Sequence, residues 1–544
     1  MTWQYDFPVA LIMKVAIIGA GVSGLPSIKC CLDEGLEPTC FERSNDIGGL
    51  WRFTNNIENG RASIYQSVVS NTSKEIMCYS DFPYPEDFPN FLPNSKLLEY
   101  IRKYAANFNL LKYIQFKTVV VGVRKCKDFE SSGQWNVTTE KDGKQETTIF
   151  DAVMVCSGHH IVPYYPVESY PGIKNFRGQH FHSREYKNSD GYKGKRVVVV
   201  GMGNSAADIA AELSRTASKV FLSTRRGAWV LSRVYDDGYP WDFCYDTRFE
   251  TFKRNNLPMS LVAYLNESKM NTWFNHTNYG LQPIDRTQFK EPLINDDLPS
   301  RITCGFVVVK PSVLDFTETA AKFEDGSIED NIDVVIFATG YSFSFPFLDE
   351  SVIKMEKNTI HLYKNVVPPA LEKPTLGILG LIQPLGPIMP TSELQGRWLT
   401  RVFKGLCPYP PLKVVMDDMA KKNKIFIKRF GTSRENRLQV DYVEYLDELA
   451  SAVGVKPNIF PLFLYDPLLA LALFFGPCTP AHFRLNGPGK WSPARKVILT
   501  TLDRVVKATK TRVVKKDDPR LSITKVLGAL CVLAVFVAVA IFRF

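Results

Sequence analysis

The chain has 544 residues, 45% of them hydrophobic, which is enough to bury a large core in two or three globular domains. Lysine and arginine exceed aspartate and glutamate by 10, a modest excess for this length that favours an anionic cofactor or an anionic membrane surface. Because no nucleic-acid-binding motif accompanies this excess, we exclude nucleic acid as a partner.

Residues 1–13 lack the basic start, the long apolar core and the cleavage site of a signal peptide, and we interpret them as an extension with Met13 as an alternative start. Residues 15–18 predict a buried parallel strand, and the sequence G-x-G-x-x-G then leads into a helix-compatible run. This turn places a helix N-terminus against a pyrophosphate. Its predicted binding residues are Gly19, Ala20, Gly21, Val22, Ser23 and Gly24.

A second apolar strand is predicted over residues 38–41 and ends in Glu42, eighteen residues after Gly24. A carboxylate there accepts the ribose hydroxyls of an adenosine, whereas the alternative is an ordinary solvated charge at a strand end. We predict that Glu42 binds a cofactor. Paired glycines before Leu50 and Trp51 indicate backbone that closes over the cofactor, with a turn and a core tryptophan as the alternative.

The next elements follow from their patterns. Helical periodicity covers residues 97–108, and alternation predicts antiparallel strands over 119–123, 135–139 and 148–150. A buried strand is predicted over residues 151–156, after which the chain enters a second domain.

The second domain repeats the first pattern. A strand over 196–200 leads into Gly201-x-Gly203-x-x-Ala206 and a helical run from Ala207 to residue 213. The next strand, 220–223, ends in Thr224 and Arg225, where an NAD-specific fold usually places an acid. Hydroxyl and guanidinium groups favour a 2′-phosphate, hence NADP, and the alternative is a surface arginine.

Residues from about 228 to 295 are rich in aromatics and fit neither nucleotide-binding half, so they are interpreted as an insertion. Their aromatic side chains either build a core or line a substrate channel or face a membrane. A strand over 332–338 and a buried strand over 376–381 return the chain to the first domain.

The C-terminal part carries two strongly apolar segments. Residues 460–475 are interrupted by two prolines and an aspartate, which predicts a core or interfacial segment. Residues 526–542 form an uncharged run of about 17 residues, close to 25 Å as a helix, which predicts a transmembrane tail anchor, with a buried terminal helix as the alternative. The basic residues before this run place its N-terminal side, and the catalytic body, in the cytosol; they are Arg504, Lys507, Lys510, Arg512, Lys515, Lys516, Arg520 and Lys525.

Eleven scattered cysteines without a C-x-x-C pair indicate a reducing compartment and exclude a dithiol relay. The seven histidines show no metal-ligand spacing, so we predict no metal site and interpret the pairs His159/His160 and His180/His182 as structural.

Taken together, these residues resemble the animal flavin-containing monooxygenases, microsomal enzymes that oxygenate soft nucleophilic heteroatoms. The stretch from Phe176 to Tyr186 matches the family's identifying pattern F-x-G-x-x-x-H-x-x-x-[YF]. The likeness extends from GAGVSG through CFERSNDIGGLW, NTSKE, GMGNSAADIA and FATGYSF to the apolar tail. It implies flavin contacts at Gly19, Gly21, Gly24, Glu42, Leu50, Trp51 and Thr72, and nicotinamide-nucleotide contacts at Ser70, Ser205, Ala206, Asp208 and Arg225.

The resemblance implies FAD and NADPH as cofactors. NADPH reduces the flavin, O2 forms a C4a-hydroperoxide, and small nucleophiles such as amines and thioethers of xenobiotics take the distal oxygen. Asn71 matches the family's active-site asparagine, which hydrogen-bonds the retained NADP and the flavin adduct, with a turn asparagine as the alternative. Asn204 matches one that positions the cofactor. The expected location is the endoplasmic reticulum membrane, and the oligomeric state stays open, a homo-oligomer included.

The predicted fold is α/β with two Rossmann-like dinucleotide-binding domains, the NADP domain inserted in the FAD domain, and a C-terminal transmembrane helix. The expected parts are an extension (1–13), the FAD domain (14–160 and 336–450), the NADP domain (161–335), a membrane-proximal region (451–525) and the anchor (526–542).

Two departures from the family pattern are expected to weaken activity at most. Ala206 adds a methyl beside the second turn, and Pro26 enters the first turn of the first helix, where proline is accepted. The alternatives are Baeyer–Villiger oxygenation of ketones, an NADPH oxidase that releases hydrogen peroxide, and a flavoprotein with weakened catalysis.

Overall fold

The computed structural model describes residues 12–284, 292–353, 360–430 and 438–512. Most of the predicted N-terminal extension and all of the predicted membrane span at 526–542 lie outside these residues. Within them, none of the helices combines the length and the apolar character needed to cross a bilayer.

A five-stranded parallel sheet forms the first nucleotide-type unit, with strand order β20-β7-β1-β2-β3. Its apolar strands are covered by helices such as α1 (Gly24–Asp33), as expected for a parallel sheet buried on both faces. The predicted strands at 15–18, 38–41, 151–156 and 376–381 are confirmed, with slightly different ends. They are β1 (Lys14–Ile18), β2 (Glu37–Glu42), β7 (Ala152–Val155) and β20 (Leu376–Ile378), joined by β3 (Ile114–Phe116).

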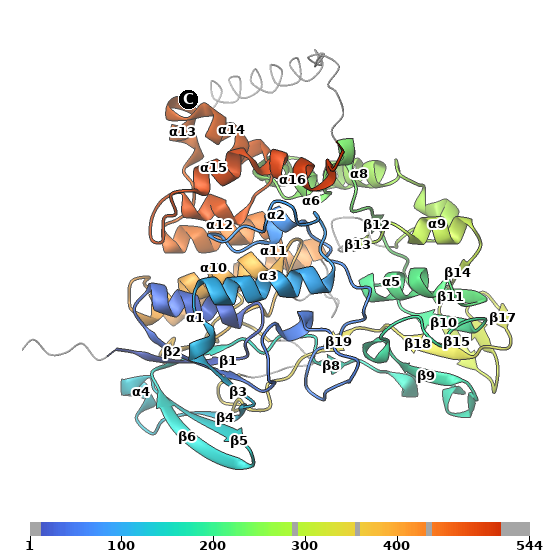
Figure 1. Ribbon diagram of the computed structural model, residues 1–544, viewed down its shortest axis with the longest axis horizontal. Helices are drawn as coiled ribbons and strands as arrows, with labels where there is room; N and C mark the ends of the chain where they lie inside the picture. Colours follow the sequence, from blue (N-terminus) through green and yellow to red (C-terminus); the bar gives the residue numbers. More distant parts are fainter. Residues whose placement is uncertain (1–11, 285–291, 354–359, 431–437, 513–544) are drawn as a thin grey trace, which may run out of the picture.

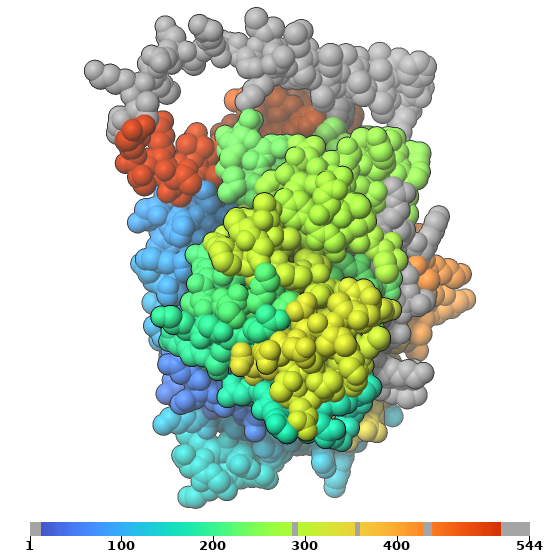
Figure 2. All heavy atoms as spheres, turned by 90° about the vertical axis from the view of Figure 1, so that its right-hand side faces the viewer, coloured from blue at the N-terminus to red at the C-terminus, as the bar shows by residue number. Residues whose placement is uncertain are grey.

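A second parallel sheet repeats this arrangement, with order β14-β11-β10-β18-β9. Helix α5 (Asn204–Leu213) follows the second glycine turn. Figure 1 shows this sheet beside the first, and residues of this green-to-yellow unit cover most of the face seen in Figure 2. Its strands are β9 (Gln179–His182), β10 (Arg196–Val200), β11 (Lys219–Ser223), β14 (Val307–Lys310) and β18 (Val334–Phe337).

Two crossing segments connect the units. Strand β8 (Val162–Pro163) pairs antiparallel with β19 (Tyr341–Ser342), so the chain leaves the first unit and returns to it along one path. Because β7 and β18 run into these segments, the carboxyl ends of both sheets face a shared region, where ligands of open α/β sheets bind.

Smaller elements surround the two sheets. The predicted helix at 97–108 and the predicted antiparallel strands are confirmed as α3 (Asn94–Asn107), β4 (Val119–Lys125), β5 (Trp135–Lys141) and β6 (Lys144–Phe150). The other short elements are α2 (Lys74–Met77), α4 (Phe129–Ser132), α9 (Leu298–Thr303), β12 (Val230–Leu231), β13 (Leu293–Ile294), β15 (Val313–Phe316), β16 (Ala321–Phe323), β17 (Ile328–Glu329), β21 (Gln383–Pro384) and β22 (Gln439–Val440).

The remaining helices belong to the insertion and to the C-terminal part. Those of the insertion are α6 (Asp242–Tyr245), α7 (Arg248–Asn256) and α8 (Met259–Met270), and Figure 1 shows α8 at the same end of the molecule as α13 to α16. The C-terminal helices are α10 (Ile388–Phe403), α11 (Leu412–Phe430), α12 (Tyr442–Val453), α13 (Ile459–Tyr465), α14 (Pro467–Phe475), α15 (Ala494–Leu499) and α16 (Thr501–Thr509).

The apolar segment 460–475 is broken at Asp466, whose carboxylate accepts a hydrogen bond from Leu469 N at the start of α14. Its first helix leaves Phe460 79%, Leu464 82% and Tyr465 83% exposed. The interfacial interpretation therefore fits α13, while α14 contributes Leu473 to a small core.

Arg504, one of the basic residues that precede the apolar run, is buried in α16, and its Nε lies 2.9 Å from Glu75 Oε2. A buried guanidinium is stable only with such a partner.

Pro26 is accommodated in the first turn of α1. A residue with an N–H at this position would donate to the carbonyl of Val22, four residues earlier. That carbonyl accepts instead from the hydroxyl of Tyr79, at 2.8 Å, so the proline leaves no buried acceptor without a partner.

Candidate functional site

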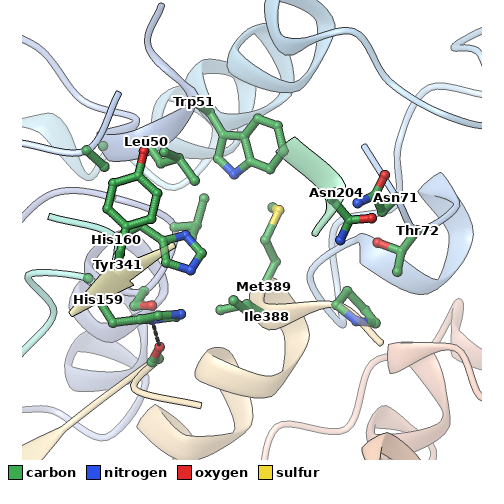
Figure 3. A pocket seen from close by; sticks show the side chains of 18 of the residues that line it. Leu50, Trp51, Asn71, Thr72, His159, His160, Asn204, Tyr341, Ile388 and Met389 are labelled. Atoms are coloured by element: carbon green, nitrogen blue, oxygen red, sulfur yellow. Dashed lines mark hydrogen bonds between the residues drawn. The ribbon is translucent and has the colours of Figure 1, made fainter. Parts of the chain in front are cut away.

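One cavity of about 1000 Å³ lies where the two units meet. Its wall combines the first glycine turn, the loop 60–72, the crossing segments, the start of α5, the insertion helices and the start of α10. Figure 3 shows Trp51, Met389, Ile388 and Tyr341 around it, with Asn71, Thr72 and Asn204 together on one side.

The first glycine turn is shaped by steric limits. Gly19 has φ +102°, and a Cβ added there would lie 2.8 Å from Cys156 O. A Cβ on Gly24 would lie 1.8 Å from Gly19 O, so only glycine lets α1 pack this closely on the turn. Of the predicted turn residues, Gly19, Gly21, Val22 and Ser23 line the cavity, whereas Ala20 and Gly24 are buried behind it.

Glu42 lies at the carboxyl end of β2 and lines the cavity. Its Oε2 accepts from Ala20 N at 2.8 Å, and its Oε1 accepts from Ser44 N and Ser44 Oγ at 2.8 and 2.7 Å. The carboxylate therefore fixes the glycine turn. Since each carboxylate oxygen has two lone pairs, it retains capacity for a ligand hydroxyl.

The predicted residues of the loop 70–72 all line the cavity, as do Leu50 and Trp51. Ser70 Oγ accepts from Leu92 N at 2.8 Å and donates to Thr72 O at 3.0 Å, which closes the loop on itself. Asn71 Oδ1 accepts from Arg233 Nη2 at 2.8 Å.

The second glycine turn reaches the cavity through Asn204, Ser205 and Asp208. Asn204 Oδ1 accepts from Ile294 N at 2.8 Å. Asp208 accepts from Tyr65 OH at 2.5 Å, and burial raises the pKa of its carboxyl. The other residues predicted there lie outside the cavity lining: Gly201, Gly203, Ala206, Ala207, Thr224 and Arg225.

Two of these outlying residues show how the second turn is built. Gly201 has φ +128°, and a Cβ there would lie 2.3 Å from Ala338 O, whereas a Cβ on Gly203 would meet no atom within 4 Å. The open space over Gly203 is what an approaching phosphate needs. Arg225 is exposed just beyond β11 at the same sheet edge.

Ala206 is fully buried, and it belongs to an apolar cluster with Val197 and Val199 of β10. Its effect on NADPH binding stays a prediction.

The cavity also contains residues that the sequence did not single out as ligands. His159 lies 3.1 Å through Nδ1 from Gly380 O, and burial lowers its pKa to about 3, so the ring is neutral. The buried Ser157 Oγ has no hydrogen-bond partner among the described residues, and Ser157 lines the cavity, as do Arg43 and Arg61. Ser157 and His159 follow β7 and Arg43 follows β2, and this position was their signal in the sequence, whereas Arg61 had none. Among the described residues, no group of three or more His, Cys, Asp or Glu side chains could hold a metal.

The insertion extends the cavity. Trp241 lines it and also packs with Leu231 and Ile294, so this aromatic residue both builds a small core and faces the cavity. The far part of the wall comes from α7 and α8, through Arg254, Asn255, Met259, Val262, Asn266 and Met270.

Three features of the cavity between the two sheets fit two dinucleotide cofactors. They are the two glycine turns, the acidic residue at the end of the first unit's second strand, and a buried hydroxyl without a hydrogen-bond partner among the described residues. The family model described as "Flavin-binding monooxygenase-like" matches residues 12–543. Dimethylaniline monooxygenase [N-oxide-forming] 2 of Pan troglodytes and flavin-containing monooxygenase 2 of Homo sapiens are each 59% identical over 525 residues, covering 96% of this chain and 98% of theirs.

Solved structures share the fold. S-allyl-L-cysteine S-oxygenase from Allium sativum has a TM-score of 0.62 at 24% identity and covers 84% of this chain and 92% of its own. An open crystal structure of cyclohexanone monooxygenase has a TM-score of 0.56 at 15% identity, covering 81% of this chain and 98% of its own. The chain belongs to the flavin-binding monooxygenase-like family and is a monooxygenase that uses FAD and NADPH.

Proposed function

We propose that this enzyme transfers one oxygen atom from O2 to a soft nucleophilic nitrogen or sulfur of small xenobiotic molecules. The observation that carries the proposal is the pair of amides, Asn71 and Asn204, on one side of a cavity walled by Trp51, Met389 and Ile388. Such a wall excludes water, while the amides supply hydrogen bonds without an acidic proton.

The bound flavin supplies the oxidising chemistry, because NADPH reduces it and it then activates O2. The chain's own residues bind, orient and shield. In this proposal the first unit holds FAD through its glycine turn, Glu42, Leu50, Trp51 and Thr72. NADPH is held by Ser70 of the loop 60–72 and by Asn204, Ser205, Asp208 and Arg225 of the second unit, with the 2′-phosphate at Arg225.

The test is a product balance on the purified, FAD-loaded full chain with NADPH and air. We choose dimethylaniline, the compound in a relative's name, together with a thioether and a ketone. The expected result is N-oxide and sulfoxide at about one per NADPH. An ester formed from the ketone would indicate a Baeyer–Villiger enzyme, peroxide equal to the NADPH consumed would indicate an oxidase, and no NADPH consumption would indicate a flavoprotein without turnover.

Asn71→Ala tests the residue on which the proposal depends. Losing its amide hydrogen bonds should lower product per NADPH by roughly ten- to a hundredfold while NADPH oxidation and peroxide release continue. A variant that stays fully coupled would remove Asn71 from the proposed role.

The proposal includes attachment to the endoplasmic reticulum membrane with the catalytic body in the cytosol. The uncharged run 526–542 and the exposed apolar side chains of α8, α13 and α14 support it, since these helices lie at one end of the molecule (Figure 1). Exposed apolar patches of this kind mark interaction surfaces. The side chains are Leu261, Tyr264, Leu265, Phe460, Leu464, Tyr465, Leu468 and Leu471.

A thiol-protection experiment tests this face in phosphatidylcholine vesicles. In a Cys304→Ser background, a cysteine at Leu468 should be protected from a membrane-impermeant thiol reagent. A cysteine at Ile328, which is also exposed but lies in β17, should react. Equal reaction at both positions would contradict contact between this face and the membrane.

A further inference from the structure

Three side chains of the insertion hold the loop that carries Asn71. Arg233 donates from Nη2 to Asn71 Oδ1 at 2.8 Å and from Nε to Ser70 O at 3.1 Å. The indole N–H of Trp241 donates to Asn71 O at 2.8 Å. Because the amide oxygen of Asn71 is occupied by a guanidinium, its NH2 group is the end left to donate to a ligand in the cavity.

The third side chain is Asp242, the first residue of α6. It has no solvent exposure, and its Oδ2 accepts from Ser73 N at 2.6 Å, two residues after Asn71. Its Oδ1 has no hydrogen-bond partner among the described residues. Asp242 does not line the cavity, so it reaches the site only through the loop.

Hydrogen bonds from Ser73 and from the backbone at the start of α6 favour the ionised form of Asp242, but its burial outweighs them. The titratable groups that interact with it electrostatically are Cys244 on its own helix and Tyr442 on α12, and Tyr442 in turn faces Asp246 and Cys78. No ion pair to Asp242 is present in the described part of the chain. Burial therefore raises the pKa of Asp242 to about 7.

A buried carboxylate without a counter-ion destabilises the fold, and an apolar residue would fill the same volume more favourably. What an apolar residue cannot do is accept the Ser73 N–H, which is equally buried and would be left without a partner. Four long-range hydrogen bonds, all made by side chains of the insertion, thus hold Ser70, Asn71 and Ser73.

We propose that Asp242 is a positioning residue: by accepting the Ser73 N–H it holds the Ser70–Ser73 loop so that the Asn71 amide faces the cavity. This inference rests on the proposed role of Asn71 but goes beyond it, because it assigns a part of the insertion outside the cavity to the control of the site.

The experiment compares Asp242→Asn, which keeps a carbonyl acceptor of the same shape, with Asp242→Leu, which removes it. Amide hydrogen exchange of the FAD-loaded full chain should show the Ser73 amide exchanging about tenfold faster or more in the Leu variant, and near the wild-type rate in the Asn variant. The Ser70 and Lys74 amides, which donate to Leu92 O and Asn90 O, are controls in the same segment.

The amount of product formed per NADPH should fall in Asp242→Leu, where the Ser73 amide exchanges faster, and should stay near the wild-type value in Asp242→Asn. Cys244→Ser, on the same helix, controls for general damage to α6, and Asp242→Ala replaces the Leu variant if that chain does not fold. Unchanged Ser73 exchange in the Leu or Ala variant would overturn the proposal. A wild type that forms no oxygenated product would refute the proposed function alone, because the exchange measurement does not depend on turnover.

Discussion

Replacing Asp242 with asparagine should stabilise the protein, and more strongly at alkaline than at acidic pH. Burial raises the pKa of Asp242 from the ordinary 3.8 to about 7. A tenfold change in an ionisation constant is worth about 1.4 kcal/mol, so the ionised side chain destabilises the folded state by about 4 kcal/mol.

The sign follows from proton binding. Between about pH 4 and pH 7 the folded state holds the proton that the unfolded chain has released, so the wild type loses stability as pH rises through this window. About 2 kcal/mol of the penalty is present at pH 5.5 and all of it at pH 8, whereas asparagine carries none at either pH.

Thermal unfolding followed by flavin release measures the difference. For a chain of this length, 2 kcal/mol corresponds to roughly 2 °C, so the gain in melting temperature of Asp242→Asn over wild type should be larger at pH 8 than at pH 5.5 by about that amount. Cys244→Ser should show no such pH dependence. An equal gain at both pH values, or a smaller gain at pH 8, would show that an ionised Asp242 does not destabilise the folded state.

Three further substitutions test the cofactor assignments. Glu42→Gln should weaken FAD binding about tenfold, measured by flavin fluorescence, because one oxygen that fixes the turn becomes an NH2 group. The control Glu37→Gln, at the exposed start of the same strand, should leave FAD binding unchanged. Arg225→Ala should raise the KM for NADPH ten- to a hundredfold and leave the KM for NADH unchanged, whereas the surface control Arg215→Ala should change neither. Equal effects on both nucleotides would contradict a contact between Arg225 and the 2′-phosphate. Gly24→Ala should give flavin-free protein, because the added methyl would lie 1.8 Å from a backbone carbonyl oxygen.

Local signals accounted for the elements that the sequence predicted well. A few consecutive residues identify each glycine turn and the strand before it, so both parallel sheets could be predicted. Glu42 could be located because it stands at a fixed distance from Gly24. The interruption of the apolar segment at 460–475 was likewise visible in its prolines.

Contacts between distant residues could not be predicted in this way. Arg233, Trp241 and Asp242 contact the Asn71 loop across more than 160 residues, and in the sequence they stand in an aromatic-rich stretch without a motif. Arg504 belongs to a run of basic residues, yet it is buried and forms an ion pair with Glu75, which is distant in the sequence. Such outcomes depend on tertiary packing, which no local pattern encodes.

In the proposed function, this cavity shields the oxygen-activating flavin from water until a nucleophile arrives. The most direct measurement reduces the full chain anaerobically with NADPH, mixes it with O2, and follows the return of the oxidised flavin spectrum with and without a thioether. We expect a slow return that the thioether accelerates, with about one sulfoxide formed per NADPH. An immediate return with peroxide equal to the NADPH consumed, unaffected by the thioether, would contradict it.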